Sequence, residues 1–408
     1  MKKVFVFLSF FLFFFPATAG AFDPKSLDAI LSQPLSEQSH IGVEIRSLSS
    51  GKTLYSRDAQ KLFTPASVQK IVTSLAALHF LGADTRFDTE ISTDGKIENS
   101  CLLGNLFLRG GGDPSLKKGD FGDLCAGLEK KGISRVEGDL IADASFFDDA
   151  PYPPGWMRDD IECDYATPVS ALSVDENFDG SPVLNPPLRA GKIFAARLEA
   201  AGIHLAGTVR VGKTPPGTTS LFIHRSPSLA ELIKEMNKHS NNFYAETLLE
   251  QLGAGEKGNR EKGIIKVSSM LAQIGWAKDG YRIADGSGLS RYNALTPSQL
   301  ASLLVYANSD PFQNSLPVAG VDGTLAHRLI GSPAAGRLFA KTGTMAGVSC
   351  LAGYLDTGKE RLAIAIMVNG FVGSAHALQA LQDSIILALI EPPPRPPQGR
   401  GGEIDKHT

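Results

Sequence analysis

The chain of 408 residues lacks the motifs that usually reveal a metal, redox or nucleic-acid protein. It has four cysteines and no Cys-x-x-Cys pair, and its eight histidines are dispersed without a His-Glu-x-x-His motif, so we expect no metal and no other cofactor. Lysine plus arginine (40) and aspartate plus glutamate (43) nearly balance, with a net charge of −3 and no basic stripe, which argues against nucleic acid as a partner. No Gly-x-Ser-x-Gly motif occurs, which argues against a Ser-His-Asp hydrolase.

Long apolar runs are also lacking, except for a short one at the N-terminus. Two lysines precede residues 4–15, a phenylalanine-rich run shorter than the roughly 20 residues that a membrane-spanning helix needs. Small residues follow, and cleavage after Ala19 or Ala21 fits equally well. The pattern predicts a signal peptide over residues 1–21 and an exported, soluble protein in the periplasm.

Export permits disulfide bonds, but the sequence does not fix any. Cys101, Cys125, Cys163 and Cys350 allow three pairings, and Cys101 with Cys125 is the local candidate. Buried free thiols are the equally acceptable alternative.

Hydrophobic patterning divides the chain into a framing region and an insert. Residues 22–85 are typical of helix, strand, strand and helix, and residues 226–391 predict helices, two apolar strands (348–355 and 361–368) and a terminal helix. Residues 86–225 carry short alternating stretches broken by Gly and Pro clusters. We therefore expect an α/β (α+β) protein with an antiparallel sheet flanked by helices, interrupted by a β-rich inserted domain. The Pro-rich tail, residues 392–408, is typical of disorder.

Ser-x-x-Lys occurs three times, and one match has the chemistry of a helix start. Ser67 and Lys70 follow Pro65, with Thr64 as candidate N-cap, and open an apolar helical run. The matches that begin at Ser49 and Ser115 lie in turn-like segments. A hydroxyl and an amine three residues apart share one helix face, where a neutral lysine can activate the serine as a nucleophile.

Two further motifs follow in order. Ser240 and Asn242 form the only Ser-x-Asn, and Lys341 begins the only Lys-Thr-Gly. Ser-x-x-Lys, Ser-x-Asn and Lys-Thr-Gly in this order resemble the active-site-serine penicillin-recognising enzymes. The long insert between Lys70 and Ser240 narrows the resemblance to the low-molecular-mass class C penicillin-binding proteins, the D-alanyl-D-alanine carboxypeptidase/endopeptidase family. Other stretches similar to that family cover residues 109–114, 165–177, 285–291 and 321–325.

The resemblance implies a serine β-lactamase/transpeptidase-like fold and a role for each motif residue. Ser67 would attack a peptide carbonyl, and Lys70 would accept its proton. Ser240 would pass a proton to the departing amine, and Asn242 would hold Lys70 or the substrate amide. Lys341, lowering the pKa of Lys70 by repulsion, would also help to bind a substrate carboxylate.

The remaining candidates would bind substrate. Thr342 and Thr344 would assist at the carboxylate, and Gly343 would let the substrate backbone lie against the strand. The backbone N–H groups of Ser67 and Thr344 would form an oxyanion hole. Asp160 would contact the amine of a diamino acid in the substrate; the alternative is a solvated acidic turn.

The resemblance predicts a serine-type D-Ala-D-Ala carboxypeptidase, with D,D-endopeptidase as a further activity, which acts on peptidoglycan stem peptides and is acylated by β-lactam antibiotics. One alternative is a serine β-lactamase, which the long insert and the lack of Glu-x-x-Leu-Asn between Ser240 and Lys341 disfavour. Another is an inactive peptidoglycan-binding scaffold, although no motif residue is missing. Peripheral association with the cell wall or membrane surface stays open, as does the oligomeric state.

Overall fold

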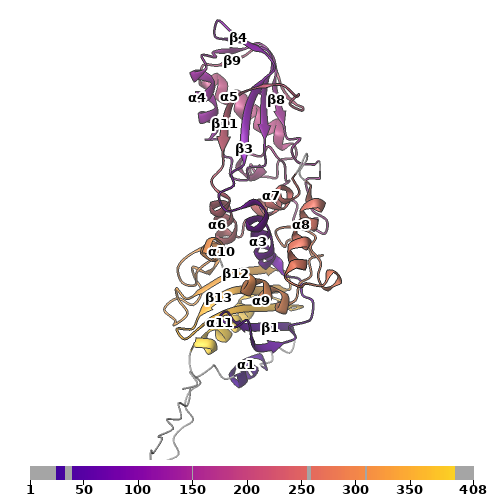
Figure 1. The fold of residues 1–408 in the computed structure, drawn as a ribbon, viewed down its shortest axis with the longest axis vertical. Helices are drawn as coiled ribbons and strands as arrows, with labels where there is room; N and C mark the ends of the chain where they lie inside the picture. Colours follow the sequence, from indigo (N-terminus) through magenta and orange to yellow (C-terminus); the bar gives the residue numbers. More distant parts are fainter. Residues whose placement is uncertain (1–23, 33–38, 149, 255–258, 308–309, 391–408) are drawn as a thin grey trace, which may run out of the picture.

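The computed structural model describes residues 24–32, 39–148, 150–254, 259–307 and 310–390. The predicted signal peptide and the predicted tail lie outside the described residues. The molecule is elongated, with one five-stranded sheet near each end and helices between them (Figure 1).

The first sheet joins strands from the two ends of the chain. Its order is β12-β13-β14-β1-β2, and every neighbouring pair is antiparallel. The strands are β1 (His40–Ser47), β2 (Thr53–Arg57), β12 (Leu338–Met345), β13 (Val348–Asp356) and β14 (Arg361–Asn369). The predicted hairpin of two late apolar strands is thus confirmed as β13 and β14, and so is the predicted antiparallel sheet completed by the N-terminal strands.

Helices cover both faces of this sheet, which explains why β13 and β14 are apolar almost without interruption. One face packs against α1 (Pro24–Leu31) and α11 (His376–Ile390). The other packs against α3 (Gln69–Leu81), α8 (Arg260–Gln273) and α9 (Pro297–Tyr306). The remaining helices of this part are α6 (Leu229–His239), α7 (Asn242–Leu252), α10 (Asp310–Ser315) and the 3-10 turns η1 (Ala66–Val68), η3 (Lys278–Gly280) and η4 (Gly323–Leu325).

The insert contains two sheets, of orders β10-β8-β6-β3-β11 and β4-β5-β7-β9. Their strands are β3 (Asp88–Thr93), β4 (Lys96–Glu98), β5 (Cys101–Leu103), β6 (Leu106–Gly110), β7 (Arg135–Val136), β8 (Leu140–Asp143), β9 (His204–Leu205), β10 (Val209–Val211) and β11 (Thr219–Arg225). Residues 136–141 divide between β7 and β8, which belong to different sheets. Between these strands, Gly138 lies so close to the neighbouring chain that a Cβ atom there would lie 2.4 Å from the Gly104 carbonyl oxygen.

The insert also contains helices that the patterning did not predict. They are α4 (Phe121–Lys130), α5 (Pro186–Ala200) and the 3-10 turn η2 (Asp175–Asn177). Phe121 of α4 and Phe194 of α5 meet edge-to-face, 5.3 Å between ring centroids, inside one apolar core with the strands. The description "β-rich" was therefore incomplete, because two helices also contribute to this core.

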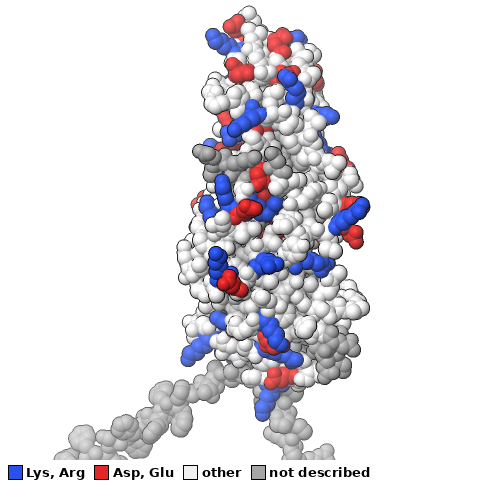
Figure 2. Space-filling view, turned by 90° about the vertical axis from the view of Figure 1, so that its right-hand side faces the viewer, with Lys and Arg blue, Asp and Glu red and all other residues white. Residues whose placement is uncertain are grey.

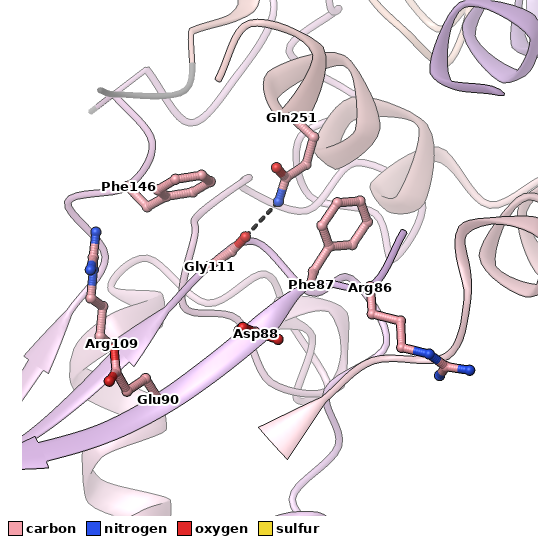
Figure 3. A pocket seen from close by; sticks show the side chains of 8 residues that line it. All are labelled: Arg86, Phe87, Asp88, Glu90, Arg109, Gly111, Phe146 and Gln251. Carbon is pink, nitrogen blue, oxygen red and sulfur yellow. Dashed lines mark hydrogen bonds between the residues drawn. The ribbon is translucent and has the colours of Figure 1, made fainter. Parts of the chain in front are cut away.

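The insert is anchored to the helices beneath it at a small pocket of about 290 Å³ (Figure 3). Gln251, near the end of α7, donates hydrogen bonds to the carbonyl oxygens of Gly111 (2.5 Å) and Gly112 (3.1 Å). Phe87 and Phe146 lie beside this contact. A buried amide therefore links the first turn after β6 to α7, the helix that begins with Asn242.

All four cysteines are free thiols, so the candidate Cys101–Cys125 disulfide was wrong. Cys125 points into the apolar core of the insert, whereas the Cys101 thiol lies 3.6 Å from the Glu137 carboxylate.

Among the described residues, no helix is long and apolar enough to cross a membrane. Basic and acidic side chains are interspersed over the face shown in Figure 2, in agreement with the near-balanced charge.

Candidate active site

Ser67 lies in the 3-10 turn η1, immediately before α3. Ala66 adopts a left-handed backbone (φ 47°), a conformation that strains a non-glycine residue. Thr64 is not the N-cap that the sequence suggested: its backbone N–H donates to Asn369 Oδ1 at 2.7 Å, and its carbonyl accepts from Asn369 Nδ2. The segment before Ser67 is therefore tied to β14 rather than capped by the Thr64 side chain.

Lys70 is completely buried and makes three hydrogen-bond contacts. Its Nζ lies 2.9 Å from Ser67 Oγ, 2.6 Å from Asn242 Oδ1 and 2.8 Å from the Ser287 carbonyl oxygen. Burial lowers the pKa of Lys70 to about 7, against the opposing influence of Asp285 and Glu246. The amine can thus be neutral near physiological pH.

Ser240 and Asn242 lie at the break between helices α6 and α7. Ser240 is left-handed (φ 59°) and ends α6, while the Asn241 side chain caps α7 by accepting from the Tyr244 N–H. This break directs Ser240 Oγ toward Lys341 Nζ, 2.9 Å away, and Asn242 Oδ1 toward Lys70. The Asn242 amide nitrogen donates to the Tyr165 carbonyl oxygen of the insert.

The Lys-Thr-Gly motif lies within β12. Lys341 is fully buried, and burial lowers its pKa well below the usual range, with a further contribution from the Lys70 charge. Thr342 points elsewhere, because its hydroxyl bonds to that of Thr324 at 2.7 Å. At Gly343 a Cβ atom would lie 2.7 Å from the Pro65 carbonyl oxygen and 3.1 Å from the Ser67 nitrogen. Glycine is therefore required here for β12 to approach the segment that carries Ser67, a reason that the sequence did not reveal.

A pocket of about 440 Å³ opens over these groups. Its lining includes Ser67, Ser240, Asn242 and Thr344 among the expected residues, whereas Lys341, Thr342 and Gly343 are not among the residues that line it. Asp160 also lines it, accepting hydrogen bonds from the Met157 N–H (3.3 Å) and the Tyr165 hydroxyl (3.1 Å). The other lining residues are Tyr165, Gly288, Leu289, Arg291, Met345 and Ala346.

Sequence reasoning assigned no role to the turn that follows Asp285, although it noted residues 285–291 as family-like. This turn supplies the Ser287 carbonyl to Lys70 and Gly288 to the pocket. Buried Asp285 organises it by accepting from Gly288 N, Ser290 N and the Trp156 indole of the insert. In the sequence, the feature that could have indicated this turn is the pair of glycines, Gly286 and Gly288, next to the acidic Asp285.

We expect Gly288→Ala to lower the rate of reaction at Ser67 on the order of a hundredfold. Gly288 has φ 87°, and a Cβ atom there would lie 1.9 Å from the Ala66 carbonyl oxygen, so the turn must move away from the nucleophile. Acylation kinetics with a fluorescent penicillin measure the effect. Gly275→Ala, a left-handed glycine with open space around it, is the control for backbone strain alone; equal losses in both variants would contradict the steric argument.

Comparison with known proteins agrees with this geometry. A family model described as D-Ala-D-Ala carboxypeptidase 3 (S13) matches residues 24–183 and 179–389. The chain belongs to this S13 family. The resemblance inferred from the three motifs is therefore confirmed.

Relatives of the S13 family match over most of the chain. A D-alanyl-D-alanine carboxypeptidase of Actinomadura sp. (strain R39) is 32% identical over 454 residues, covering 90% of this chain and 84% of the relative. The crystal structure of penicillin binding protein 4 (dacB) from Haemophilus influenzae matches with a TM-score of 0.82 at 26% identity, covering 90% of this chain and 99% of that chain. A structure of the same protein complexed with a novel β-lactam matches with a TM-score of 0.73 at 28% identity, covering 88% and 97%.

Proposed function

We propose that the protein is a serine-type D-Ala-D-Ala carboxypeptidase that acts on peptidoglycan stem peptides and is acylated by β-lactams. The observation that carries the proposal is the contact between Ser67 Oγ and Lys70 Nζ (2.9 Å) beside an open pocket, with a Lys70 pKa of about 7. The activity for which the Actinomadura relative is named, and the β-lactam complex of the Haemophilus influenzae protein, support it.

The hydrogen bonds of Lys70 suit a general base. The Asn242 side-chain oxygen and the Ser287 carbonyl oxygen can only accept, so a neutral Lys70 directs its two N–H groups to them. Its lone pair then faces Ser67 Oγ and takes the hydroxyl proton as the oxygen attacks the penultimate D-alanine carbonyl. The N–H groups of Ser67 and Thr344 would stabilise the resulting oxyanion.

Ser240 and Lys341 would complete the reaction. The amine of the departing D-alanine needs a proton, which Ser240 can pass on because its hydroxyl bonds to Lys341. An incoming substrate carboxylate favours the protonated form of Lys341, and that charge in turn drives the proton off Lys70. Thr344, which lines the pocket, would assist in binding the carboxylate, whereas the expected role of Thr342 is not supported because its hydroxyl bonds to that of Thr324. Water then releases the shortened peptide from Ser67.

Incubation of the protein with a pentapeptide ending in D-Ala-D-Ala tests the proposal, with free D-alanine as the product measured. Free D-alanine is the expected result; none would support an inactive scaffold instead. A D,D-endopeptidase activity shares the acyl-enzyme step and is tested on a crosslinked muropeptide. A long-lived penicilloyl adduct is expected, whereas rapid hydrolysis of penicillin would favour a β-lactamase.

We expect Asp160→Asn to weaken turnover of peptides with a free side-chain amine roughly tenfold, at about 1.4 kcal/mol. Asp160 borders the pocket from the insert, where its carboxylate would meet the amine of a diamino acid. Turnover of a diamino-acid peptide and acylation by penicillin, which lacks that amine, are compared in the same variant. Equal effects on both would indicate a solvated acidic turn, and Asp159→Asn is the control, since Asp159 is exposed.

We also infer that the chain is exported to the periplasm after removal of residues 1–21, since its substrate lies in the cell wall. Residues 22–85 and 226–391 would form the catalytic domain and residues 86–225 the inserted one. In support, the strands of residues 88–225 pair only with one another among the described residues.

A further inference from the structure

Glu246 is a buried carboxylate that is separated from Lys70 by the backbone of one turn, residues 286–287. It lies on α7, one helical turn after Asn242, so both side chains share a helix face. Helices α3 and α7, which carry Lys70 and Glu246, lie side by side (Figure 1). Glu246 is fully buried, and no motif of the sequence pointed to it.

The Glu246 carboxylate holds the Gly286–Ser287 backbone. Its Oε1 accepts from the Ser287 N–H at 2.8 Å, and both of its oxygens lie 3.1 Å from the Gly286 nitrogen. On the other side of the same residues, the Ser287 carbonyl accepts from Lys70 at 2.8 Å, and the Gly286 carbonyl accepts from the Thr73 hydroxyl at 2.6 Å. The turn is therefore fixed between α7 and α3.

Resting on the proposed function, we infer that Glu246 is a positioning residue, which clamps the 286–287 turn against Lys70 and supplies a negative charge that the lysine senses. A carboxylate suits both tasks, because its oxygens accept from two backbone N–H groups and a buried charge acts strongly at low dielectric.

The other charges around the pair set the sign of the effect. Lys70 faces the carboxylates of Asp285 and Glu246, which both raise its pKa, and the buried side chain of Lys341, whose own pKa is lowered by burial and by the charge of Lys70. Glu246 faces Asp285 and Arg260; burial first, and then Asp285, raise its pKa to about 7, while Arg260 lowers it. Removal of the Glu246 charge must lower the pKa of Lys70, so a larger fraction of Lys70 is neutral near pH 7, where Glu246 is still partly ionised.

The test is the pH profile of the second-order rate constant for penicillin acylation, between about pH 5 and pH 9. Glu246→Gln keeps one acceptor oxygen and loses the charge. We expect the midpoint of its acid limb to move to lower pH, with a plateau within about tenfold of wild type. Glu246→Asp keeps the charge on a shorter side chain, so we expect a lower plateau and an unmoved limb.

Glu250→Gln is the matched control. Glu250 lies on the same helix, is equally buried and has a pKa raised to about 7 by burial, but it pairs with Arg260 at 3.1 Å. The acid limb of the Glu250→Gln pH profile should therefore lie at the same pH as in the wild-type protein. An unmoved limb in Glu246→Gln, or the same shift in Glu250→Gln, would overturn the inference.

A further variant covers the case in which Glu246→Gln does not fold. Thr73→Val removes the second bond to the turn without changing any charge, and we expect a lower plateau with an unmoved limb. Unchanged plateaus in both Thr73→Val and Glu246→Asp would overturn the clamp. Failure of the wild-type protein to react with penicillin at all would instead contradict the proposed function, so the two failures are distinguishable.

Discussion

Ser67→Ala should abolish the covalent penicillin adduct and lower peptide turnover on the order of a thousandfold or more. The hydroxyl is the atom that forms the acyl bond, and no other hydroxyl stands beside Lys70 Nζ among its hydrogen-bond contacts in the described residues. The fold should remain intact, since Ser67 is only half-buried and its neighbours Ala66 and Val68 supply the apolar contacts. Mass spectrometry of the protein after incubation with penicillin measures the adduct.

Ser49→Ala is the matched control for this variant. Ser49 belongs to another Ser-x-x-Lys of the chain, but it is exposed in the turn between β1 and β2, where its hydroxyl meets that of Ser47. The Ser49→Ala protein should react with penicillin at the wild-type rate. A Ser67→Ala protein that still formed the adduct would contradict the assignment of the nucleophile, and circular dichroism of both variants excludes loss of folding as the cause.

Hydrophobic patterning predicted the framing fold because its signal is local. The sequence of strand β1 alternates, although both of its faces are largely buried in the structure. Strands β13 and β14 are continuously apolar, as burial on both faces demands. The insert was predicted less well. Strands of two to four residues, such as β7 and β8, are too short for a period to register, and the parallel pairing of β8 with β6 and β10 depends on contacts distant in sequence.

The types and order of the motif residues predicted the candidate site, but they did not predict the groups that hold those residues in place. The structure brings together five residues that the motifs indicated: Ser67, Lys70, Ser240, Asn242 and Lys341. Ser-x-x-Lys spacing places its serine and lysine on one helix face, whereas the other two motifs were predicted from their residue types and their order alone. The carbonyl that holds Lys70 belongs to Ser287, whose identity only the tertiary structure decides. Any residue can offer a carbonyl, so no side-chain pattern marks the position.

Lys70→Met is expected to lower the rate of acylation by roughly 10²–10⁴-fold, the usual contribution of a general base. Methionine has a similar length but no basic nitrogen, and it leaves Asn242 Oδ1 and the Ser287 carbonyl without the donor that they share. Lys118→Met is the control, since Lys118 ends the third Ser-x-x-Lys of the chain and is exposed. Equal rates for Lys70→Met and wild type would remove Lys70 from the mechanism.

The pH dependence of the same rate separates the base from a merely structural lysine. Burial lowers the pKa of Lys70 to about 7, so the proton-accepting neutral form dominates above pH 7 and the ammonium below it. Wild-type acylation should therefore rise through about pH 7 to a plateau, and fall about tenfold per pH unit well below it. The residual rate of Lys70→Met should show no such rise, because the group that titrates has gone. A rise through the same pH in that variant would assign the titration to another residue, of which Glu246, with a pKa also near 7, is the first to examine by Glu246→Gln.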